Sequence, residues 1–385
     1  MRITMVIGGL TGGGAERVCV NLANAWVARG RHVTLLTVAQ NRIGPAYGID
    51  SRVERRDVGH PRKPNSEELN ASSITAITRG LDQAGCPELV AEIDLIAMLR
   101  CAILATSPDL VVAHIDMTNV RVLAAMHERG VPVIACEHTD LNLVSLPRWQ
   151  AARQALYRGA AAVVASHPAS ANWLARFGAT AYSIPNPILP PPPAQLEQTG
   201  HRNRVVAITR LSPEKRPALL VRAFASIAGD FPEWDLDVCG VGPLGEPLAG
   251  LVDELSPGRI RLLGFVNDPY AILHGAKLFV STSWVEGFGN AVWEALACGV
   301  PVVAMECGAS VRSLVREGID GLIVRSGGIS ALGAALASLM GDEERRKAFA
   351  ARAPEVLTRF GIESSLDAWE ALLATVAQTS VCGPR

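Results

Sequence analysis

The chain has 385 residues, of which 49% are hydrophobic and 19% are charged, and its formal net charge at pH 7 is −1. This length predicts two domains, and the composition excludes a disordered protein because it supplies enough apolar residues for large buried cores. A net charge so close to zero gives no overall attraction to nucleic acid, so no nucleic-acid partner is expected.

The eight cysteines are scattered and form no Cys-x-x-Cys pair. This spacing favours buried free thiols in a reducing compartment over a disulfide framework. The sequence starts directly with a strand pattern and shows no signal-peptide pattern, and no apolar run approaches the roughly 18 residues of a membrane span. We therefore expect a cytoplasmic protein.

The first 38 residues predict a βαβ unit and hence a parallel sheet. An apolar strand over residues 3–7 leads into the glycine-rich stretch 8–14, then a helix that stops at Gly30, and a second strand over residues 32–38. Backbone N–H groups where a glycine loop enters a helix can bind a phosphate, although a tight structural turn explains the loop equally well. The glycines do not fit G-x-G-x-x-G and no acidic residue follows the second strand, which disfavours a Rossmann oxidoreductase.

The next elements continue the alternation of helices and strands. Residues 42–75 show no period and predict a loop, and residues 89–104 have helical spacing. Strands are predicted over residues 109–114 and 131–136, with a helix over about 119–129 between them.

Polar residues follow both of these strands. His114 and Asp116 follow the first, and residues 137–140 follow the second. Ligands of open α/β sheets bind beyond the carboxyl ends of strands, so His138 stands where an active-site group would lie. A structural hydrogen-bonding role for a single histidine is the alternative.

Residues 147–158 predict a helix that is basic and aromatic, with Arg148, Trp149, Arg153 and Tyr157 among its residues. Such a helix can lie on an anionic membrane surface or contact a phosphorylated lipid, or it can simply carry a solvated face. A strand at 161–166 and a short helix at 170–176 follow.

The proline-rich stretch 184–193, followed by polar residues to 203, is typical of a linker between domains. The predicted domains are residues 1–187 and 204–360, joined by a linker over 188–203. A terminal segment, residues 361–385, contains apolar residues at helical spacing over 366–376, and this face must be buried somewhere.

The second half starts with a strand over residues 204–208, followed by Arg210 and Lys215 around a turn. A fixed guanidinium and a mobile ammonium at the end of a strand can clamp a diphosphate. The alternative is surface charge beside Glu214. Strands are also predicted at 234–239 and 260–263.

The most informative stretch is residues 285–294, which lies between a strand at 277–280 and a helix at 291–297. Two carboxylates, Glu286 and Glu294, bracket a glycine-rich turn whose helix start favours an anion such as a diphosphate. Asn290 is the expected N-cap of that helix. This arrangement suggests a nucleotide-sugar site, and an ordinary turn with two solvated glutamates is the alternative.

Taken together and in order, these motifs resemble the retaining glycosyltransferases of the GT4 family. The motifs are residues 13–17, 137–139, 184–187, 210–215 and 286–294, and the similarity covers nearly the whole chain. The resemblance implies an α/β protein of the GT-B fold, with two Rossmann-like doubly wound domains facing a central cleft. It also implies that the C-terminal helix crosses back to the N-terminal domain.

The resemblance further implies a set of site residues. The expected catalytic residues are His138, Glu286, Arg210 and Lys215. The expected donor-binding residues are Gly13, Gly14, Arg210, Lys215, Val266, Glu286, Phe288, Gly289, Asn290 and Glu294. By this resemblance Arg210 and Lys215 neutralise the diphosphate, Glu286 binds hydroxyls of the transferred sugar, Glu294 holds the ribose, and His138 lies on the acceptor side near the sugar.

The expected substrates are a nucleotide-sugar donor, with UDP-sugar favoured, and a glycan or polyprenyl-diphosphate-linked acceptor. No cofactor and no metal are expected, because Arg, Lys and backbone amides can stabilise the leaving diphosphate. Peripheral contact with an anionic membrane, on the inner face of the cell membrane, is a hypothesis based on the 147–158 segment and on a lipid-linked acceptor. Another GT-B enzyme, such as a nucleotide-sugar epimerase or a phosphorylase, and a non-catalytic nucleotide-sugar-binding protein are the alternatives.

One segment departs from the family pattern. In residues 307–315, Val311 and Ser313 stand where many relatives have Pro and Glu. The segment adjoins the donor half, so the departure bears on sugar or nucleotide contacts there.

Overall fold

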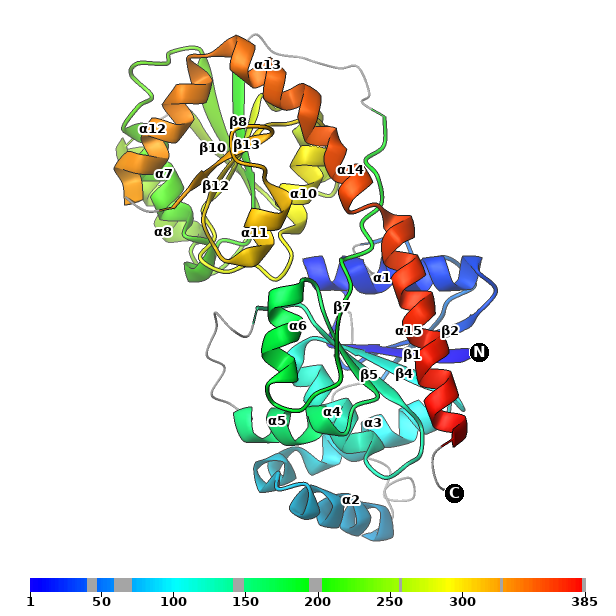
Figure 1. Cartoon of the computed structure of the whole chain (residues 1–385). Helices are drawn as coiled ribbons and strands as arrows, with labels where there is room; N and C mark the ends of the chain where they lie inside the picture. Colours follow the sequence, from blue (N-terminus) through cyan, green and yellow to red (C-terminus); the bar gives the residue numbers. More distant parts are fainter. Residues whose placement is uncertain are drawn as a thin grey trace. The chain divides into compact units, whose positions relative to one another are not determined.

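The computed structural model describes residues 1–39, 47–58, 71–140, 149–193, 203–255, 258–325 and 328–382. The chain divides into two compact units. Unit 1 comprises Met1–Ile188 and Ile362–Arg385, and unit 2 comprises Leu189–Gly361. In both units a parallel sheet lies between layers of helices (Figure 1), which confirms the predicted α/β class with two doubly wound halves.

Unit 1 is built on a parallel sheet with the strand order β3-β2-β1-β4-β5-β6-β7. Its strands are β1 (Arg2–Ile7), β2 (His32–Thr37), β3 (Glu54–Asp57), β4 (Leu110–His114), β5 (Val133–Glu137), β6 (Ala162–Ala165) and β7 (Ala181–Ser183). The order runs one way from β1 to β3 and the other way from β4 to β7. The boundary between β1 and β4 is therefore a topological switch point, where open α/β sheets bind ligands.

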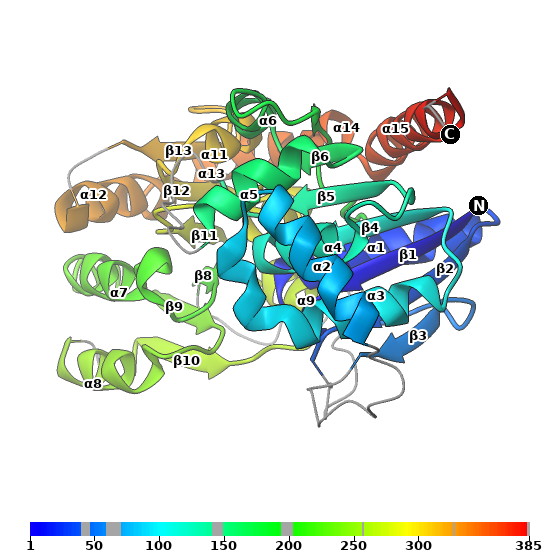
Figure 2. The same cartoon turned by 90° about the horizontal axis from the view of Figure 1, so that it is seen from below.

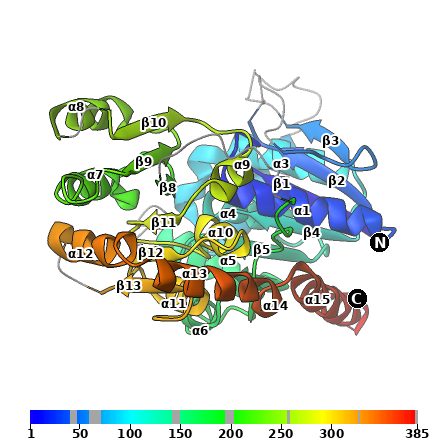
Figure 3. The same ribbon diagram turned by 90° about the horizontal axis from the view of Figure 1, so that it is seen from above.

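Helices cover both faces of this sheet. They are α1 (Gly14–Ala28), α2 (Ala71–Gln83), α3 (Ile93–Leu104), α4 (Asp116–Met126), α5 (Gln150–Arg158), α6 (Pro168–Ala175) and α15 (Ile362–Cys382). Residues of α2, α3, α4, α5 and α6 form one core cluster with one face of the strands, and residues of α1 and α15 form another with the opposite face. Figure 2 shows the first group over the sheet, and Figure 3 shows α1 on the other side.

Alternation along the strands assigns each side chain to a face. In β4, Val111 and Ala113 belong to the α2–α6 face, whereas Leu110 and Val112 belong to the face of α1 and α15. The C-terminal helix is held there by an edge-to-face contact between Trp369 and Trp26, whose ring centroids are 5.6 Å apart. The apolar stripe of the terminal segment is therefore buried within unit 1.

Unit 2 repeats the plan with the strand order β10-β9-β8-β11-β12-β13, again parallel. Its strands are β8 (Asn203–Ile208), β9 (Trp234–Cys239), β10 (Ile260–Gly264), β11 (Leu278–Ser281), β12 (Val302–Met305) and β13 (Gly321–Val324). Its helices are α7 (Pro217–Ala225), α8 (Gly245–Leu255), α9 (Pro269–His274), α10 (Asn290–Ala297), α11 (Ala309–Leu314), α12 (Gly328–Met340), α13 (Glu343–Arg352) and α14 (Val356–Arg359). The switch point of this sheet lies between β8 and β11.

Within the predicted linker over 188–203, Ile188 belongs to unit 1, residues 189–193 group with unit 2, and Asn203 is the first residue of β8. The Tyr270 hydroxyl lies 3.5 Å from the carbonyl oxygen of Leu189, and a ring nitrogen of His274 lies 2.9 Å from that of Pro192. Residues 194–202 of the linker lie outside the described residues.

Some predicted element bounds were wrong. Strand β3 lies inside the stretch 42–75 that was predicted to be a loop, of which residues 42–46 and 59–70 lie outside the described residues. Its sequence is Glu-Arg-Arg-Asp and all four residues are exposed, so it lacks any apolar period, and it is held by pairing with β2 at the sheet edge. The helix predicted at 89–104 begins as a 3₁₀ helix over Pro87–Glu92.

The predicted basic, aromatic surface helix is also different in the structure. Helix α5 begins at Gln150, and Arg148 lies outside the described residues. Trp149, Arg153 and Tyr157 are buried in unit 1, and Arg153 pairs with Asp116 at 3.1 Å. The interpretation of these three side chains as a membrane-facing surface was therefore wrong. Among the described residues we find no helix with the length and apolar character needed to cross a membrane.

Candidate active site

The predicted phosphate-binding and sugar-binding residues of unit 2 follow two neighbouring strands. Arg210 and Lys215 follow β8, and Glu286 follows β11. Strands β8 and β11 pair in parallel, so both loops leave the sheet at its carboxyl edge. The switch point of the sheet lies between them, which is the place where this class of sheet binds ligands.

The loop after β8 is fixed by its neighbours. The backbone N–H of Leu211 donates to the carbonyl of Val241 at 3.0 Å, and the N–H of Leu244 donates to the carbonyl of Leu211 at 2.9 Å. A Cβ atom at Gly240 would lie 1.8 Å from the Thr209 carbonyl oxygen, so only glycine allows this close approach. The loop that carries Arg210 is therefore held by the glycine-rich loop after β9.

Lys215 and Glu286 form an ion pair across the switch point. The Nζ atom of Lys215 lies 2.6 Å from Oε1 of Glu286, and the two side chains are 20% and 18% exposed. The Thr282 hydroxyl donates to the carbonyl oxygen of Lys215 at 2.7 Å, which ties the two loops together. A cation and a carboxylate, both partly accessible, are thereby held at one point of the sheet edge.

Two cations, Arg210 and Lys215, belong to the loop after β8. Arg210 is exposed in the same loop. Although burial raises the pKa of Glu214, the hydrogen bond from Ser212 and the charges of Lys215 and Arg210 together lower it. An anionic ligand at this edge would meet the same two cations.

The turn at residues 287–290 differs from the prediction in its cap. Helix α10 begins at Asn290, and its N-cap is Gly289, with a φ of +91°. The prediction that Asn290 is the N-cap was wrong, because the chain enters the helix one residue earlier through a left-handed conformation that glycine adopts without strain. A Cβ atom at Gly289 would also lie 3.2 Å from Cδ1 of Leu314.

The other predicted donor residues have different degrees of burial. The side chain of Phe288 is 4% exposed and packs edge to face on Phe360 at 5.8 Å, so its predicted place beside the sugar could involve only its backbone. Glu294 lies on α10 and is 1% exposed. Val266, after β10, is half-buried, and Asn290 is half-buried as well.

The segment that departs from the family pattern contacts the turn that carries Glu286. The Ser310 hydroxyl donates to the backbone carbonyl of Glu286 at 3.3 Å. Val311 is fully buried, and the Ser313 hydroxyl donates to the carbonyl of Ser310 within α11 at 2.7 Å. Sequence analysis did not identify Ser310 as part of the site. The only available signal was its place in a segment next to the donor half.

In unit 1, backbone N–H groups of the glycine loop after β1 are hydrogen-bonded to a side chain of α1, the helix that follows the loop. The backbone N–H groups of Gly12 and Gly13 donate to Oε2 of Glu16, at 2.6 and 3.1 Å. The Tyr47 hydroxyl donates to the carbonyl oxygen of Gly12 at 2.8 Å. The amide of Gly13, which was predicted to face a phosphate, is therefore engaged by Glu16 in this structure, and Gly14 is the first residue of α1.

His138 lies directly after β5 and contacts His114, the last residue of β4. Nδ1 of His114 lies 3.0 Å from Nε2 of His138, and the rings are stacked with an interplanar angle of 19°. Burial lowers the pKa of His138 to about 4. Burial and then the neighbouring His138 lower the pKa of His114 well below its usual value.

Glu137 points to the opposite face of the sheet from His138. It accepts hydrogen bonds from the Tyr157 hydroxyl and from Asn119, the latter at 3.5 Å. Burial raises the pKa of Glu137 to about 7, in spite of the hydrogen bond from Tyr157. Sequence analysis had assigned Tyr157 to a surface helix, and only the packing of α5 on α4 and β5 reveals its contact with Glu137.

A third polar cluster anchors the segment that follows His138. The Ser170 hydroxyl donates to Oδ1 of Asp140 at 2.9 Å, and Nε2 of His167 lies 3.4 Å from Oδ2 of the same carboxylate. Nδ1 of His167 accepts from the Ser170 backbone N–H at 3.4 Å, so this histidine is the N-cap of α6. All three side chains are buried, and the cluster holds Asp140 in place.

The structure thus gathers the predicted residues into two sets. Arg210, Lys215, Glu286 and the turn before α10 lie at the carboxyl edge of the unit 2 sheet. Gly13, Gly14 and His138 lie at the carboxyl edge of the unit 1 sheet.

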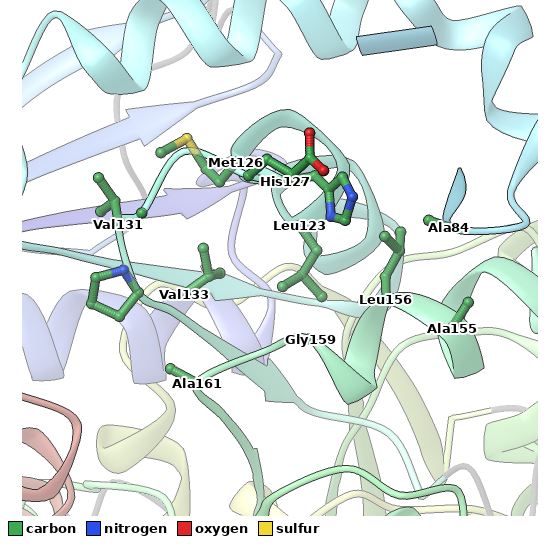
Figure 4. A pocket seen from close by; sticks show the side chains of 13 residues that line it. Ala84, Leu123, Met126, His127, Val131, Val133, Ala155, Leu156, Gly159 and Ala161 are labelled. Carbon is green, nitrogen blue, oxygen red and sulfur yellow. The ribbon is translucent and has the colours of Figure 1, made fainter. Parts of the chain in front are cut away.

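A cavity of about 410 Å³ lies at the opposite edge of the unit 1 sheet (Figure 4). Its lining includes Leu123, Met126, Val133 and Leu156, and it opens beside the amino-terminal ends of β5 and β6. Because it is mainly apolar and lies at the wrong edge of the sheet, it is separate from the candidate site.

Two carboxylates of β9 have the spacing of a metal-binding sequence. Asp235 and Asp237 form an Asp-x-Asp sequence that the expectation of a metal-free site overlooked. Both are buried in β9 and bind arginines, Asp235 with Arg259 at 2.9 Å and Asp237 with Arg261 at 2.7 Å. Within the described ranges, no group of three or more His, Cys, Asp or Glu side chains is placed to hold a metal ion.

Comparison with known protein families identifies the class of protein that has this fold and these two sheet edges. Residues 13–186 match the family described as "Glycosyl transferase 4-like domain", and residues 193–356 match "Glycosyl transferases group 1". The chain therefore belongs to the two-domain glycosyltransferases of the GT-B fold.

Particular relatives share this organisation. The chain is 23% identical over 378 residues to a Campylobacter jejuni enzyme, the GalNAc-alpha-(1->4)-GalNAc-alpha-(1->3)-diNAcBac-PP-undecaprenol alpha-1,4-N-acetyl-D-galactosaminyltransferase, covering 98% of this chain and 99% of the relative. It is 30% identical over 194 residues to the poly(glycerol-phosphate) alpha-glucosyltransferase of Bacillus subtilis, covering 50% of this chain. It is 28% identical over 387 residues to an exopolysaccharide phosphotransferase of Streptomyces coelicolor, covering 94% of this chain. The chain spans 28% and 39% of the length of the last two relatives.

A solved structure shows the same fold. The crystal structure of Anabaena HepE in complex with UDP and glucose matches with a TM-score of 0.78 at 20% identity, covering 97% of this chain and all of the neighbour.

Proposed function

We propose that this protein transfers a sugar from a nucleotide diphosphate sugar, with UDP-sugar favoured, to a hydroxyl of a glycan or lipid-linked glycan. The observation that carries the proposal is the meeting of Lys215 and Glu286 at the switch point of the unit 2 sheet, with Arg210 in the same loop. Cations suit a departing diphosphate, and a carboxylate suits sugar hydroxyls. The Anabaena neighbour, whose structure holds UDP and glucose, supports the choice of donor.

In the proposed reaction the bond between the anomeric carbon and the diphosphate oxygen breaks first. Arg210 and Lys215 stabilise the negative charge that develops on the nucleoside diphosphate. The acceptor hydroxyl then attacks from the face that the diphosphate has left, so the anomeric configuration is retained. Its proton passes to the departing phosphate oxygen, and no protein nucleophile and no metal ion take part.

The ion pair between Lys215 and Glu286 has a role in donor binding. Each group neutralises the other at 2.6 Å in this structure. A bound diphosphate sugar would replace this contact with two new ones, phosphate on Lys215 and hydroxyl on Glu286. Glu294 would hold the ribose hydroxyls from α10, and the backbone of residues 288–290 would line the pocket.

The acceptor belongs to cell-envelope or exopolysaccharide synthesis in this proposal. The Campylobacter relative, which is matched over almost its whole length, is named for action on a diphospho-undecaprenol glycan. A lipid-linked acceptor of that kind would place the reaction at the cytoplasmic face of the membrane. The buried side chains of α5 give no support to the 147–158 segment as the membrane contact.

The proposal is tested with a panel of UDP-, GDP- and ADP-sugars, by calorimetric binding and by slow hydrolysis to free sugar. We expect the protein to bind and hydrolyse one of these nucleotide sugars. NMR should show that the released sugar first has the same anomeric configuration as the donor. The rate should be unchanged in EDTA. Absence of both binding and hydrolysis for every donor would overturn the proposal, and a sugar phosphate formed from inorganic phosphate would identify a phosphorylase.

A further inference from the structure

His114 is a fully buried side chain that the proposed reaction does not use. It ends β4, and its Nδ1 lies 3.0 Å from Nε2 of His138. The two rings are nearly parallel, with centroids 5.3 Å apart. The contact joins a buried histidine to the half-buried one that sequence analysis placed in the site.

The strand register produces this contact. His114 lies opposite Cys136 in the β4–β5 ladder, and His138 is two residues beyond Cys136. Side chains two residues apart in an extended chain point to the same face, so His138 follows Cys136 toward the face of α1 and α15. His114 belongs to this same face by the alternation of β4, because Leu110 and Val112 lie there.

Both imidazoles are neutral near pH 7, since burial lowers both of their pKa values. A neutral imidazole has one N–H group and one nitrogen lone pair. The hydrogen bond between the two rings can therefore run in either direction. Either His114 Nδ1–H donates to His138 Nε2, or His138 Nε2–H donates to His114 Nδ1.

The other nitrogen of His114 decides between the two. Its Nε2 is buried and has no hydrogen-bond partner among the described residues. If His138 were the donor, His114 would carry its proton on Nε2, and a buried N–H group would have no acceptor. Orphaned buried N–H groups are rarer in proteins than acceptors that lack a donor.

We propose that His114 donates its Nδ1–H to Nε2 of His138 and thereby holds His138 in the tautomer that carries its proton on Nδ1. His114 is a positioning residue in this scheme. The nitrogen that His138 turns away from His114 is then a hydrogen-bond donor and has no basic lone pair.

The consequence for the reaction rests on the proposed function. In that function, a sugar hydroxyl that contacts Nδ1 of His138 accepts a hydrogen bond from it, and this nitrogen cannot take the proton of the attacking hydroxyl. This agrees with a transfer in which that proton passes to the departing phosphate. A general base at this place would need the opposite tautomer.

The tautomer is measured directly by ¹⁵N NMR of the full chain labelled at histidine. The chain has eight histidines, so the signals of His138 are assigned from their loss in His138→Gln. We expect a protonated Nδ1 and an unprotonated Nε2 for His138 at pH 7. A protonated Nε2 in the wild-type protein would overturn the proposal, and this observation depends on no variant of His114.

The effect of His114 is measured in His114→Phe, which keeps an aromatic ring and removes both nitrogens. We expect the Nε2–H form of His138 to appear, whereas the control His274→Phe in unit 2 leaves the His138 signals unchanged. If His138 stays wholly in the Nδ1–H form, another group sets the tautomer and the proposal fails. Thermal unfolding verifies that the variant is folded.

Activity separates this inference from the proposed function. In donor hydrolysis, His114→Phe should lower kcat about as much as His138→Gln, and the double variant should lose no more than either single variant. Additive losses would refute a role of His114 through His138. If no nucleotide sugar is hydrolysed by the wild-type protein while NMR shows the Nδ1–H form, the proposed function fails and the tautomer assignment stands.

Discussion

The carboxyl edges of the two sheets share a doubly wound topology but differ in how far their titratable groups are removed from solvent. In unit 2, the switch point holds a cation and a carboxylate in direct contact, and both side chains remain partly accessible. In unit 1, the polar groups Glu137, His138 and His114 are shifted by burial toward their neutral forms. The same doubly wound plan thus carries a partly exposed ion pair at one edge and a cluster of desolvated groups at the other.

Desolvation explains the difference. A carboxyl group enclosed by apolar neighbours keeps its proton at higher pH, and an enclosed imidazole loses its proton at lower pH. At the unit 2 edge, Lys215 and Glu286 are both partly exposed to solvent and lie 2.6 Å apart. The following predictions test this contrast, from the largest expected effect to the smallest.

Trp369→Ala should destabilise unit 1 by about 3–5 kcal/mol, because a buried aromatic side chain and its contact with Trp26 are lost. Urea unfolding measures the loss of stability, and amide hydrogen exchange shows where it occurs. Increased exchange should be confined to unit 1, including α1. The exposed residue Gln378 on the same helix provides the control, since Gln378→Ala should change stability by no more than about 0.5 kcal/mol. Equal loss of protection in both units would contradict the assignment of α15 to unit 1.

Lys215→Ala and Arg210→Ala should each lower the rate of donor hydrolysis by roughly 100- to 1000-fold. This is the typical effect in enzymes of removing one preorganised group that stabilises a developing negative charge. Folding should be little affected, as thermal unfolding will verify. Arg222→Ala removes an exposed cation on α7 of the same unit and should leave the rate unchanged. Wild-type rates in both site variants would refute the role of Lys215 and Arg210 in stabilising the diphosphate. The proposed difference between the two sheet edges would then have no functional consequence.

Sequence analysis predicted the doubly wound halves because buried parallel strands are short apolar runs between helices that end at glycine. It missed β3 because that strand has no apolar face and depends on its pairing with β2. It placed Asn290 at the cap because asparagine is a frequent N-cap, whereas the left-handed conformation of Gly289 moved the helix start by one residue.

The site was only partly predictable for a similar reason. The sequence places Lys215 and Glu286 after two strands, but their ion pair joins residues 71 positions apart and depends on β8 lying beside β11. The His114–His138 contact depends on the register of β4 and β5 in the same way. Tyr157 was assigned to a solvated face because a short helix with mixed residues does not indicate which face α4 will cover.

Glu137→Gln should remove a pH dependence of stability that amounts to about 3 kcal/mol in the wild type. The pKa of Glu137 rises from its usual 4.5 to about 7 on folding, and each unit is worth about 1.36 kcal/mol. Between these values the folded state keeps a proton that the unfolded state releases. The contribution of Glu137 is therefore fully present below pH 4.5 and is lost as the pH rises to 7.

The measurement is urea unfolding of the wild type and Glu137→Gln at several pH values from 4.5 to 8. The stability difference in favour of the variant should grow up to pH 7 and then become constant. His138→Gln should show the opposite slope, because a lowered histidine pKa costs stability as the pH falls from 6.5 to about 4. A difference that is independent of pH for Glu137→Gln would refute the burial of a neutral carboxyl group at this edge.

Ser310→Ala should give the smallest effect, a two- to tenfold increase in KM for the donor, about the worth of one hydrogen bond. The Ser310 hydroxyl donates to the backbone carbonyl of Glu286 at 3.3 Å, so its loss would loosen the turn that presents this carboxylate to the sugar. Since no charge is removed, kcat should change less than in Lys215→Ala. Ser313→Ala is the matched control and should leave KM unchanged, because among the described residues its hydroxyl donates to the Ser310 carbonyl within α11 and not to the turn that carries Glu286. Equal effects of the two serine variants would mean that α11 supports the site through its packing, and that the Ser310 hydroxyl does not position Glu286.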